Sequence, residues 1–391
     1  MIKRNILDCM TLVGGTPLRF EGEKTYVSTG AVDCDHVDYA QTERVTYDNR
    51  PSRANLSVAE GDILFAKMCG TKKTLRIDRP LSEHLYSTGF CAVRANESLM
   101  DAALLYHLLA SDQFLTQKDQ NSSGATQKAI TNAGLRKIVI QVPDLPEQRK
   151  LAANLDCIEQ MMANRREQLV SFDQLVKSRF IELFGMPGTD AFGWGLVPLG
   201  STCNINPKKS LDSRLVSGAM VSFVPMPAVT EHGEIDATAI KEYDEVKTGF
   251  TYFAENDVLF AKITPCMENG KGAVAKGLHN GIGFGSTEFH VLRPISGKTD
   301  PYWIYTLTAF SQFRMDAASN MTGSAGQRRV PASFLENYRV SLPPIALQEQ
   351  FAAFVEQTDK SKYYSSLSFR YCQAAANTYR QEWMTCRTSD F

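Results

Sequence analysis

The sequence lacks a hydrophobic run that could cross a membrane, and it lacks an excess of either charge. A membrane-spanning helix needs about 20 consecutive apolar residues, and no such run occurs among the 391 residues. The first residues, Met1-Ile-Lys-Arg, contain no apolar signal-peptide core, so we expect a cytoplasmic protein. Basic residues number 42 and acidic residues 43, whereas counterion release makes a non-specific nucleic-acid coat strongly basic. The sequence excludes such a coat, and any binding to DNA must come from local clusters.

Sequence signatures of metal binding and of methyl transfer are also missing. The nine cysteines are scattered, without a Cys-x-x-Cys pair, which favours free thiols in a reducing compartment. None of the six histidines forms a His-x-x-x-His pattern, so we expect no metal site. The base-holding motif of amino-methyltransferases, Asn/Asp-Pro-Pro-aromatic, does not occur. Its nearest counterpart, Asn204-Ile-Asn-Pro-Lys208, lacks the second proline and the aromatic residue.

Two other segments resemble catalytic motifs but have simpler explanations. Gly281-Ile-Gly-Phe-Gly285 resembles a nucleotide-binding glycine loop, yet it leads into a strand rather than a helix, which favours a tight turn. Pro143-Asp-Leu-Pro-Glu-Gln-Arg-Lys150 has the Asp…Glu-x-Lys order of some nucleases, but Asp144 is better explained as a helix cap. We therefore predict that the chain is not itself an enzyme.

What the sequence contains is one internal repeat, whose copies lie about half its length apart. Gly61-Asp-Ile-Leu-Phe-Ala-Lys67 returns as Asn256-Asp-Val-Leu-Phe-Ala-Lys262. Ser87-Thr-Gly-Phe90 returns as Ser286-Thr-Glu-Phe289. Because the matches keep one order, they indicate a duplicated domain rather than a solenoid of many short repeats.

Each copy predicts a compact α+β domain. Short β-rich segments bounded by glycine and proline predict strands, namely Thr25–Ser28 and Phe90–Arg94 in the first copy and Val221–Val224 and Phe289–Arg293 in the second. An amphipathic helix is expected at about Asp101–Lys118 and again at about Pro301–Ala318. A glycine-rich turn follows in both copies and begins with Asn121-Ser-Ser-Gly124 and with Asn320-Met-Thr-Gly323. A last apolar strand comes after it, at Lys137–Val142 and Tyr338–Leu342.

A long helix is predicted after each domain. Glu147–Phe184 contains neither glycine nor proline, and its apolar residues are spaced alternately four and three apart, which is the pattern of a coiled-coil seam. We predict that the seam consists of Leu151, Leu155, Ile158, Met162, Leu169, Phe172, Val176 and Leu183. At about 1.5 Å per residue this helix would be about 57 Å long.

The second long helix begins after Pro343-Pro344 and has a poorer seam, for which we predict Phe351, Phe354, Leu367 and Tyr371. Because a heptad-patterned helix alone would expose its apolar stripe, we expect the two helices to pair antiparallel. The alternative is that each docks on another subunit. The predicted fold class is α+β, with domains at 1–146 and 186–343 and coiled-coil helices at 147–185 and 344–391.

This order of domains and helices resembles the specificity (S) subunit of type I restriction–modification systems. Val142-Pro-Asp-Leu-Pro-Glu-Gln148 and Leu342-Pro-Pro-Ile-Ala-Leu-Gln-Glu-Gln350 open the two long helices, and a proline turn followed by Glu-Gln is characteristic of that family. The resemblance covers essentially the whole chain. One departure is that Phe192–Pro198 leads into the second copy, whereas the first copy starts almost directly at its first strand, so we expect the first copy to lack this lead-in segment.

The resemblance implies a non-catalytic subunit with two target-recognition domains, each of which reads one half of a bipartite site in double-stranded DNA. The helices would set the gap between the half-sites and dock two methyltransferase subunits. Those partners would bring S-adenosylmethionine, and motor–nuclease subunits would join them for cleavage. Two alternatives stay open: a single-chain enzyme that fuses recognition with its own methyltransferase or nuclease activity, and a coiled-coil adaptor for proteins alone.

Side chains that read bases offer paired donors and acceptors, and basic side chains near them bind phosphate. Such residues follow the Phe-Ala-Lys strands and the glycine-rich turns in both copies. We predict that the DNA-binding residues are Lys67, Lys72, Lys73, Arg76, Thr126, Gln127 and Lys128 in the first copy and Lys262, Asn269, Lys271, Lys276, Gln327, Arg328 and Arg329 in the second. Solvated turns would have the same composition, and Lys67 and Lys262 could instead cap the strands that they end.

Overall fold

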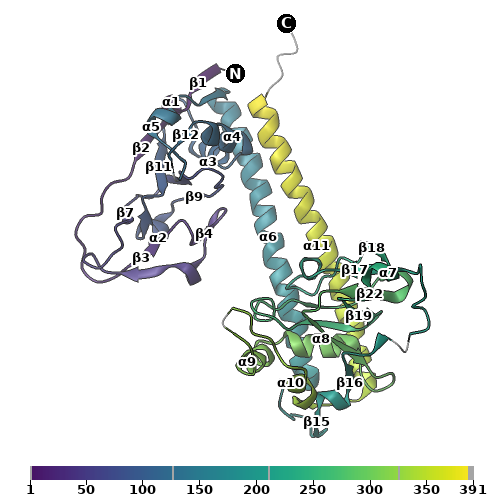
Figure 1. The fold of residues 1–391 in the computed structure, drawn as a ribbon. Coiled ribbons are helices and arrows are strands. Elements are labelled where there is room, and N and C mark those ends of the chain that lie inside the picture. The colour runs from purple at the N-terminus through teal and green to yellow at the C-terminus, as the bar shows by residue number, and fades with distance from the viewer. Residues whose placement is uncertain (1, 126, 210–211, 325, 386–391) are drawn as a thin grey trace. The chain divides into compact units, whose positions relative to one another are not determined.

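The computed structural model describes residues 2–125, 127–209, 212–324 and 326–385, and the side chains as far as Arg380. Internal packing divides the chain into two compact units. The first consists of residues 1–166 and of the last helix from Leu367 onward, and the second of residues 167–366. Each unit contains one copy of the repeat and a part of each long helix (Figure 1).

Two four-stranded sheets form the first copy. One has the order β2 (Met10–Val13), β11 (Phe90–Ala95), β8 (Ile63–Ala66) and β9 (Thr74–Arg76), and all its neighbours are antiparallel. The other has the order β6 (Glu43–Val45), β3 (Lys24–Val27), β10 (Leu85–Ser87) and β7 (Ala54–Leu56), with β3 and β10 parallel. Three short strand pairs complete the copy: β1 (Ile2–Asn5) with β14 (Val139–Val142), β4 (Val32–Asp33) with β5 (His36–Val37), and β12 (Ser122–Ser123) with β13 (Ala129–Ile130).

The second copy repeats the strand order of both four-stranded sheets. Its first sheet has the order β16 (Cys203–Ile205), β23 (Phe289–Pro294), β20 (Val258–Ala261) and β21 (Gly272–Val274). Its second sheet has the order β18 (Ile240–Glu242), β17 (Met220–Val224), β22 (Ile282–Gly285) and β19 (Thr251–Ala254), and here β17 and β22 are the parallel pair. The predicted duplication is therefore confirmed.

The expectation that the first copy lacks the lead-in segment is wrong. β15 (Leu196–Pro198) opens the second copy and pairs antiparallel with β24 (Arg339–Ser341). β1 pairs with β14 in the same way, because Ile2 lies opposite Val142 and Asn5 opposite Val139. Both copies thus begin with the strand that pairs with their own last strand.

The single helix predicted in each copy is in fact two. In the first copy α3 (Ala102–Leu109) is followed by α4 (Asp112–Gln120), and in the second α8 (Pro301–Ala309) is followed by α9 (Ser311–Ser319). The Ser111 hydroxyl accepts a hydrogen bond from the Phe114 amide at 3.1 Å and so caps the start of α4. In the second copy Phe310 has an extended backbone that ends α8. The amphipathic pattern continues across both breaks, which is why it concealed them.

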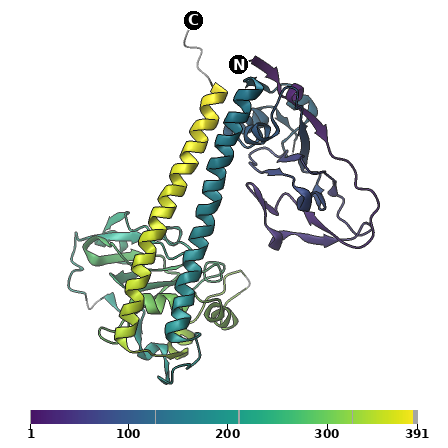
Figure 2. The ribbon, with the colours of Figure 1, turned by 180° about the vertical axis from the view of Figure 1, so that it is seen from behind.

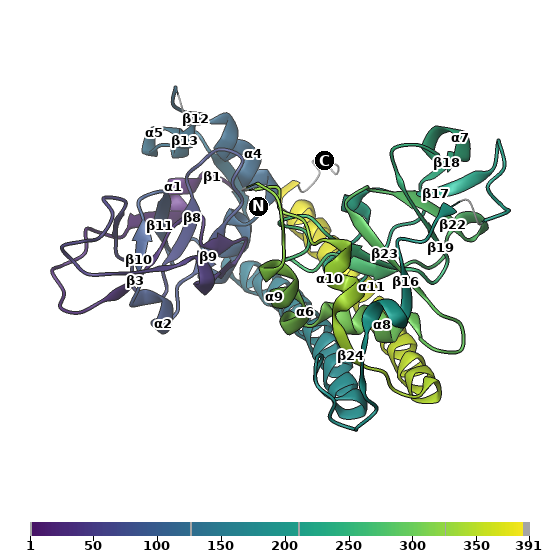
Figure 3. The same ribbon diagram turned by 60° about the horizontal axis from the view of Figure 1, so that its bottom comes forward.

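The other described α-helices within the two domains are short. The first copy has α1 (Ile6–Cys9), α2 (Arg79–Ser82) and α5 (Asn132–Leu135), and the second has α7 (Tyr243–Val246) and α10 (Ala332–Asn337). Figure 3 shows α5 and the β12–β13 hairpin beside α4, at the end of the first copy where the glycine-rich turn lies.

The main core of each unit joins the domain to the long helices. In the first unit Phe65 of β8 and Leu104 of α3 share one buried cluster with Leu155 of the long helix α6 (Leu145–Phe184). In the second unit Phe260 of β20 and Trp303 of α8 share a cluster with residues of both long helices. In each unit the all-antiparallel sheet and the domain helices therefore pack against the long helices, and buried apolar area connects the domain to them.

The long helices α6 (Leu145–Phe184) and α11 (Ile345–Thr385) pair antiparallel, as predicted (Figures 1 and 2). In the first unit the Asn154 amide donates to the Tyr379 hydroxyl at 2.9 Å, and the guanidinium of Arg166 lies 5.2 Å from the ring centre of Phe369. In the second unit Lys362 binds Asp173 at 2.6 Å, and the rings of Phe184 and Phe351 lie 5.4 Å apart. The residue order of these contacts runs in opposite directions along the two helices.

The predicted seam positions have different outcomes on the two helices. All eight on α6 are buried or half-buried. On α11 Phe351 is buried and Phe354 and Leu367 are half-buried, but Tyr371 is wrong, since it is 68% exposed. The side chains of α11 that are turned inward at alternating spacings of four and three are Phe351, Val355, Thr358, Lys362, Ser365, Phe369, Cys372, Ala376 and Tyr379. Because several of these are small or polar, hydrophobicity alone pointed to the wrong face.

No described helix combines the length and the apolar character that a membrane crossing requires. The cysteines of the described ranges are free thiols.

Candidate DNA interface

A buried glutamine connects each domain to its long helix. Gln148 lies in the first turns of α6, where its side-chain amide donates to the carbonyls of Leu99 and Pro143, both at 2.9 Å. Its side-chain oxygen accepts the amide proton of Asp101 at 2.8 Å, and Asp101 is the cap of α3. Gln348 makes the same set of bonds at the start of α11, with Lys298, Pro343 and Asp300. The glutamine five residues after Pro143 and after Pro343 therefore fixes each domain to its helix, and in the second copy this glutamine precedes the Glu349-Gln350 pair.

The repeated Asp of the Phe-Ala-Lys motif is also part of the framework. Asp257 binds both Arg293 Nε at 2.8 Å and Nη2 at 2.7 Å, and it accepts the Ala254 amide at 2.7 Å. Asp62 accepts Arg94 Nε at 2.8 Å and the Ala59 amide at 2.8 Å. Both carboxylates are buried. The two buried carboxylates hold the turn before each strand, so Asp62 and Asp257 are not candidates for DNA contact.

The glycine-rich turn of each copy lies beside the lysine that ends the Phe-Ala-Lys strand. The Lys67 carbonyl accepts the amide of Ile130 at 2.9 Å, and the Lys262 carbonyl accepts the amide of Val330 at 2.9 Å. The Lys67 ammonium donates to the Thr88 carbonyl at 3.0 Å, which supports the strand-capping alternative. Burial lowers the pKa of Lys262. In each copy the structure thus places the loop after the Phe-Ala-Lys strand next to the glycine-rich turn, and both loops contain predicted DNA-binding residues.

The tips of these turns are accessible. Gln127, Lys128 and Gln327 are exposed, while Thr126 lies outside the described residues. Arg328 is exposed and donates to the carbonyls of Ala318 at 3.0 Å and Met321 at 3.2 Å. These side chains can reach a DNA backbone or a groove without unfolding any element.

An ion pair and a hydrogen bond hold part of the basic loop that follows the Phe-Ala-Lys strand in the first copy. Lys72 is exposed and pairs with Asp112 at 2.5 Å, and Lys73 donates to the Thr29 carbonyl at 2.8 Å. In the second copy Asn269 is exposed and Lys271 half-buried. Exposed ion pairs are weak, so phosphate can compete for Lys72 at little cost.

Sequence reasoning missed Lys118, which shapes the first of these loops. Its ammonium is buried and donates to the carbonyls of Ala66, Met68 and Thr71 at 3.2, 2.7 and 2.9 Å. Burial lowers the pKa of this amine. The one available signal was a lysine on the inward face of an amphipathic helix.

Two of the predicted DNA-binding residues form ion pairs with the long helices. Arg76 pairs with Asp156 of α6 and lies 4.1 Å from the ring centre of Tyr106. Lys276 lies 3.6 Å from Glu356 of α11. We therefore assign Arg76 and Lys276 to the contact between domain and helix.

Arg76 belongs to a network around His107, whose side chain is fully buried. His107 Nε2 lies 2.9 Å from Asp156, and Nδ1 lies 3.3 Å from Glu159. These are metal-ligand types within reach of one another, but Arg76 and Arg380 already neutralise the two carboxylates. Burial acts to raise the pKa of Asp156, yet Arg76 and His107 outweigh it and hold that pKa below its usual range. We interpret the cluster as an ion-pair network that docks the domain on the helices.

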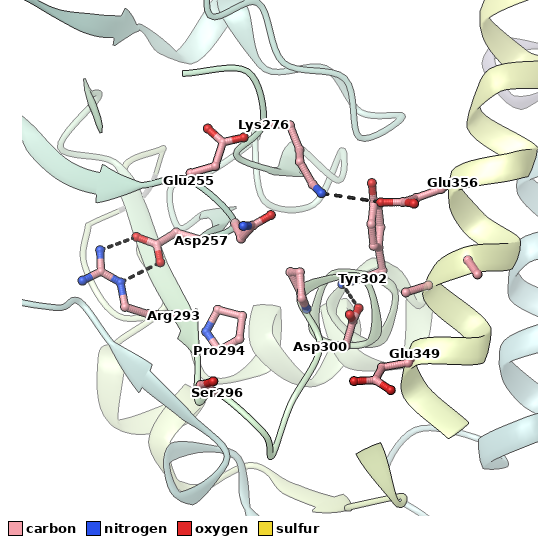
Figure 4. A pocket seen from close by; sticks show the side chains of 14 residues that line it. Glu255, Asp257, Lys276, Arg293, Pro294, Ser296, Asp300, Tyr302, Glu349 and Glu356 are labelled. Atoms are coloured by element: carbon pink, nitrogen blue, oxygen red, sulfur yellow. Dashed lines mark hydrogen bonds and ion pairs between the residues drawn. The ribbon is translucent and has the colours of Figure 1, made fainter. Parts of the chain in front are cut away.

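The second unit also has a cavity of about 620 Å³ between its domain and the start of α11 (Figure 4). Figure 4 shows Lys276 reaching toward Glu356 and Arg293 paired with Asp257. The lining carboxylates outnumber the basic side chains. Because such a surface repels phosphate, this cavity is not the DNA site.

Comparison with known proteins agrees with the duplicated architecture. The family model described as the type I restriction modification DNA specificity domain matches residues 15–170 and again residues 193–363. The type I restriction enzyme EcoEI specificity subunit of Escherichia coli is 43% identical over 153 residues, which are 39% of this chain and 25% of that protein. The match thus spans about a quarter of the length of the curated relative.

Two solved structures share the fold. The type I restriction-modification system S subunit from M. genitalium has a TM-score of 0.54 at 14% identity and is matched over 98% of this chain and 96% of its own. A chain from a structure of complex assembly and conformational transition in the type I R-M system has a TM-score of 0.53 at 20% identity, with 98% and 97% covered. Since the two family matches extend over more than half of its residues, the chain belongs to the type I restriction modification DNA specificity family.

Proposed function

We propose that the chain is the DNA-specificity subunit of a type I restriction–modification complex, with each α+β domain reading one half of a bipartite site. One observation carries this proposal: two domains with the same strand order and the same anchoring glutamine differ in the side chains of their exposed turns. A shared framework with different reading surfaces is what the recognition of two different DNA sequences requires.

The long helices supply the spacing and the docking surface in this proposal. Their outer faces expose large apolar side chains, among them Met161 and Val170 on α6 and Tyr364 and Tyr371 on α11. Exposed apolar side chains on a helix favour the packing of a partner. The partners are two methyltransferase subunits that bring S-adenosylmethionine, and motor–nuclease subunits join them for cleavage. The chain itself has no catalytic role in this proposal.

A reciprocal substitution experiment tests the proposal. The wild-type chain is co-expressed with its methyltransferase subunits, and the methylated motif is determined by sequencing. Replacing Gln127 and Lys128 with Ala should relax one half-site, and replacing Gln327, Arg328 and Arg329 with Ala should relax the other. A change in both halves from either set, or methylation by the purified chain alone, would contradict the proposal.

A further inference from the structure

One turn carries different chemistry in the two copies. The Lys67 amide donates to the Gly89 carbonyl at 2.9 Å, and the Lys262 amide donates to the Glu288 carbonyl at 2.9 Å, so Gly89 and Glu288 are equivalent. Opposite each of them lies the glycine-rich turn, where Ala129 bridges Met68 and Arg329 bridges Ile263. The second copy therefore has a carboxylate and a guanidinium where the first has neither.

The Glu288 carboxylate holds the Arg329 guanidinium in a defined plane. Arg329 Nε lies 2.9 Å from one carboxylate oxygen and Nη2 lies 2.8 Å from the other. Nη1 donates to the Gln327 carbonyl at 3.2 Å. The hydrogen bond from Arg329 lowers the pKa of Glu288, so this carboxyl is ionised at neutral pH. A bidentate pair of this kind fixes the direction of the guanidinium as well as its position.

The pair leaves one edge of the guanidinium available. An arginine carries five N–H donors, and Arg329 uses one on Nε, one on Nη1 and one on Nη2 in these bonds. The remaining proton on each terminal nitrogen meets no acceptor among the residues that the structure describes. The Arg329 side chain is 41% exposed, so this edge can meet a ligand.

Two parallel donors on one edge match guanine, whose O6 and N7 accept a bidentate arginine in the major groove. We propose that Arg329 reads a guanine in the half-site of the second domain and that Glu288 is the residue that positions it. This inference rests on the proposed function and adds the base that is read. It also makes the guanine contact a property of the second domain alone.

The first copy cannot make the same contact. Ala129 has no donor, and a Cβ placed on Gly89 would lie 2.9 Å from Thr29 Cγ2. A glutamate at position 89 would therefore need Thr29 to move. We therefore expect the two half-sites to differ at the base pair that meets Ala129 in the first domain and Arg329 in the second.

The test uses the full chain in complex with its methyltransferase subunits and a library of duplexes randomised at each position of the wild-type site. Arg329→Lys keeps the positive charge but removes the paired donors of the guanidinium. Glu288→Ala and Glu288→Gln remove the bidentate support of Arg329. Arg214→Lys is the matched control: Arg214 pairs with Asp212 in the same bidentate manner, but its Nη1 is used by the carbonyls of Asn280 and Gly281.

We expect Arg329→Lys to reduce the preference for guanine at one position of one half-site by about 5-fold to 100-fold, the range of a single bidentate contact. The Glu288 variants should reduce the preference at that same position. Arg214→Lys should leave all positions unchanged. Melting temperatures and the salt dependence of binding should stay close to wild type for Arg329→Lys, because the fold and the number of phosphate contacts are kept.

Three outcomes overturn the inference. If the wild-type complex selects no bipartite sequence, the proposed function fails as well. If it selects one in which Arg329→Lys and the Glu288 variants change no single position, only the assignment of Arg329 and Glu288 fails. If the position that changes is not a guanine, the base assignment is wrong.

Discussion

Gln148 and Gln348 make the same three hydrogen bonds at the start of α6 and α11, and both side chains are fully buried. Each bonds the cap of a domain helix, the turn before the long helix and a loop carbonyl. A single side chain therefore connects the orientation of the long helix to the domain, as the proposed reading of two separated half-sites requires.

Replacing Gln148 with Ala should lower the free energy of unfolding by about 1–3 kcal/mol, because the Asp101 amide and two carbonyls would lose their buried partner. Denaturant unfolding followed by circular dichroism measures the change. Gln160→Ala is the control, since Gln160 lies exposed on the same helix and should change the value by less than about 0.5 kcal/mol. Equal changes in the free energy of unfolding for both variants would contradict the anchoring role of Gln148.

The Asp156 network predicts a pH-dependent contribution to stability. The pKa of Asp156 is lowered in the folded state, so its stabilising effect is present at neutral pH and is lost as the pH falls through the ordinary carboxyl range and then the lower folded value. Asp156→Asn should destabilise the protein at pH 7 by less than about 1 kcal/mol, because the carboxylate is 41% exposed.

Unfolding of wild type and Asp156→Asn should be compared from about pH 7 down to about pH 3, where the difference should shrink. Exposed Glu167→Gln on the same helix serves as the control. A difference that grows toward acid pH would mean that Asp156 is protonated more readily in the folded state, contrary to the network.

The register of the α11 seam can be tested with two substitutions. Ala376 is 2% exposed, so Ala376→Leu should overpack the seam and destabilise the protein by about 1–3 kcal/mol. Tyr371→Ala should have little effect on unfolding, since Tyr371 is 68% exposed. A larger destabilisation from Tyr371→Ala than from Ala376→Leu in thermal unfolding would support the seam predicted from the sequence.

The spacer role of the helices predicts the effect of a matched insertion. Seven residues inserted into both α6 and α11 keep the heptad register and lengthen each helix by about 10 Å. The sequenced methylation motif should keep both half-sites and gain a longer gap. Seven residues in α6 alone provide the control, because the seam residues would then face the wrong partners. An unchanged gap after the paired insertion would exclude the spacer role.

The sequence predicted the repeated framework well because its motifs are local. The Phe-Ala-Lys strands and the proline turns each read as a short pattern, and each forms the expected element. The break between α3 and α4 at Ser111 was not predicted, because the apolar periodicity continues through it. The pairing of Arg76 with Asp156 could not be predicted because Asp156 lies far along the chain on another element. The α11 seam escaped because Ser365 and Ala376 are inward residues without strong hydrophobicity.

The pairing of Glu288 with Arg329 was equally hidden from the sequence. Arg329 was predicted to bind DNA from its place after a glycine-rich turn, but nothing in that turn points to a residue on the β22–β23 connection. Only the fold brings the two side chains within 2.8 Å.

Methylome sequencing of cells with and without this gene tests whether the chain specifies a bipartite DNA site. We expect one bipartite motif, with two unlike half-sites and a fixed gap, that is methylated in the presence of the gene and unmethylated in its absence. An undivided or palindromic motif, or a methylome that does not change with the gene, would contradict it.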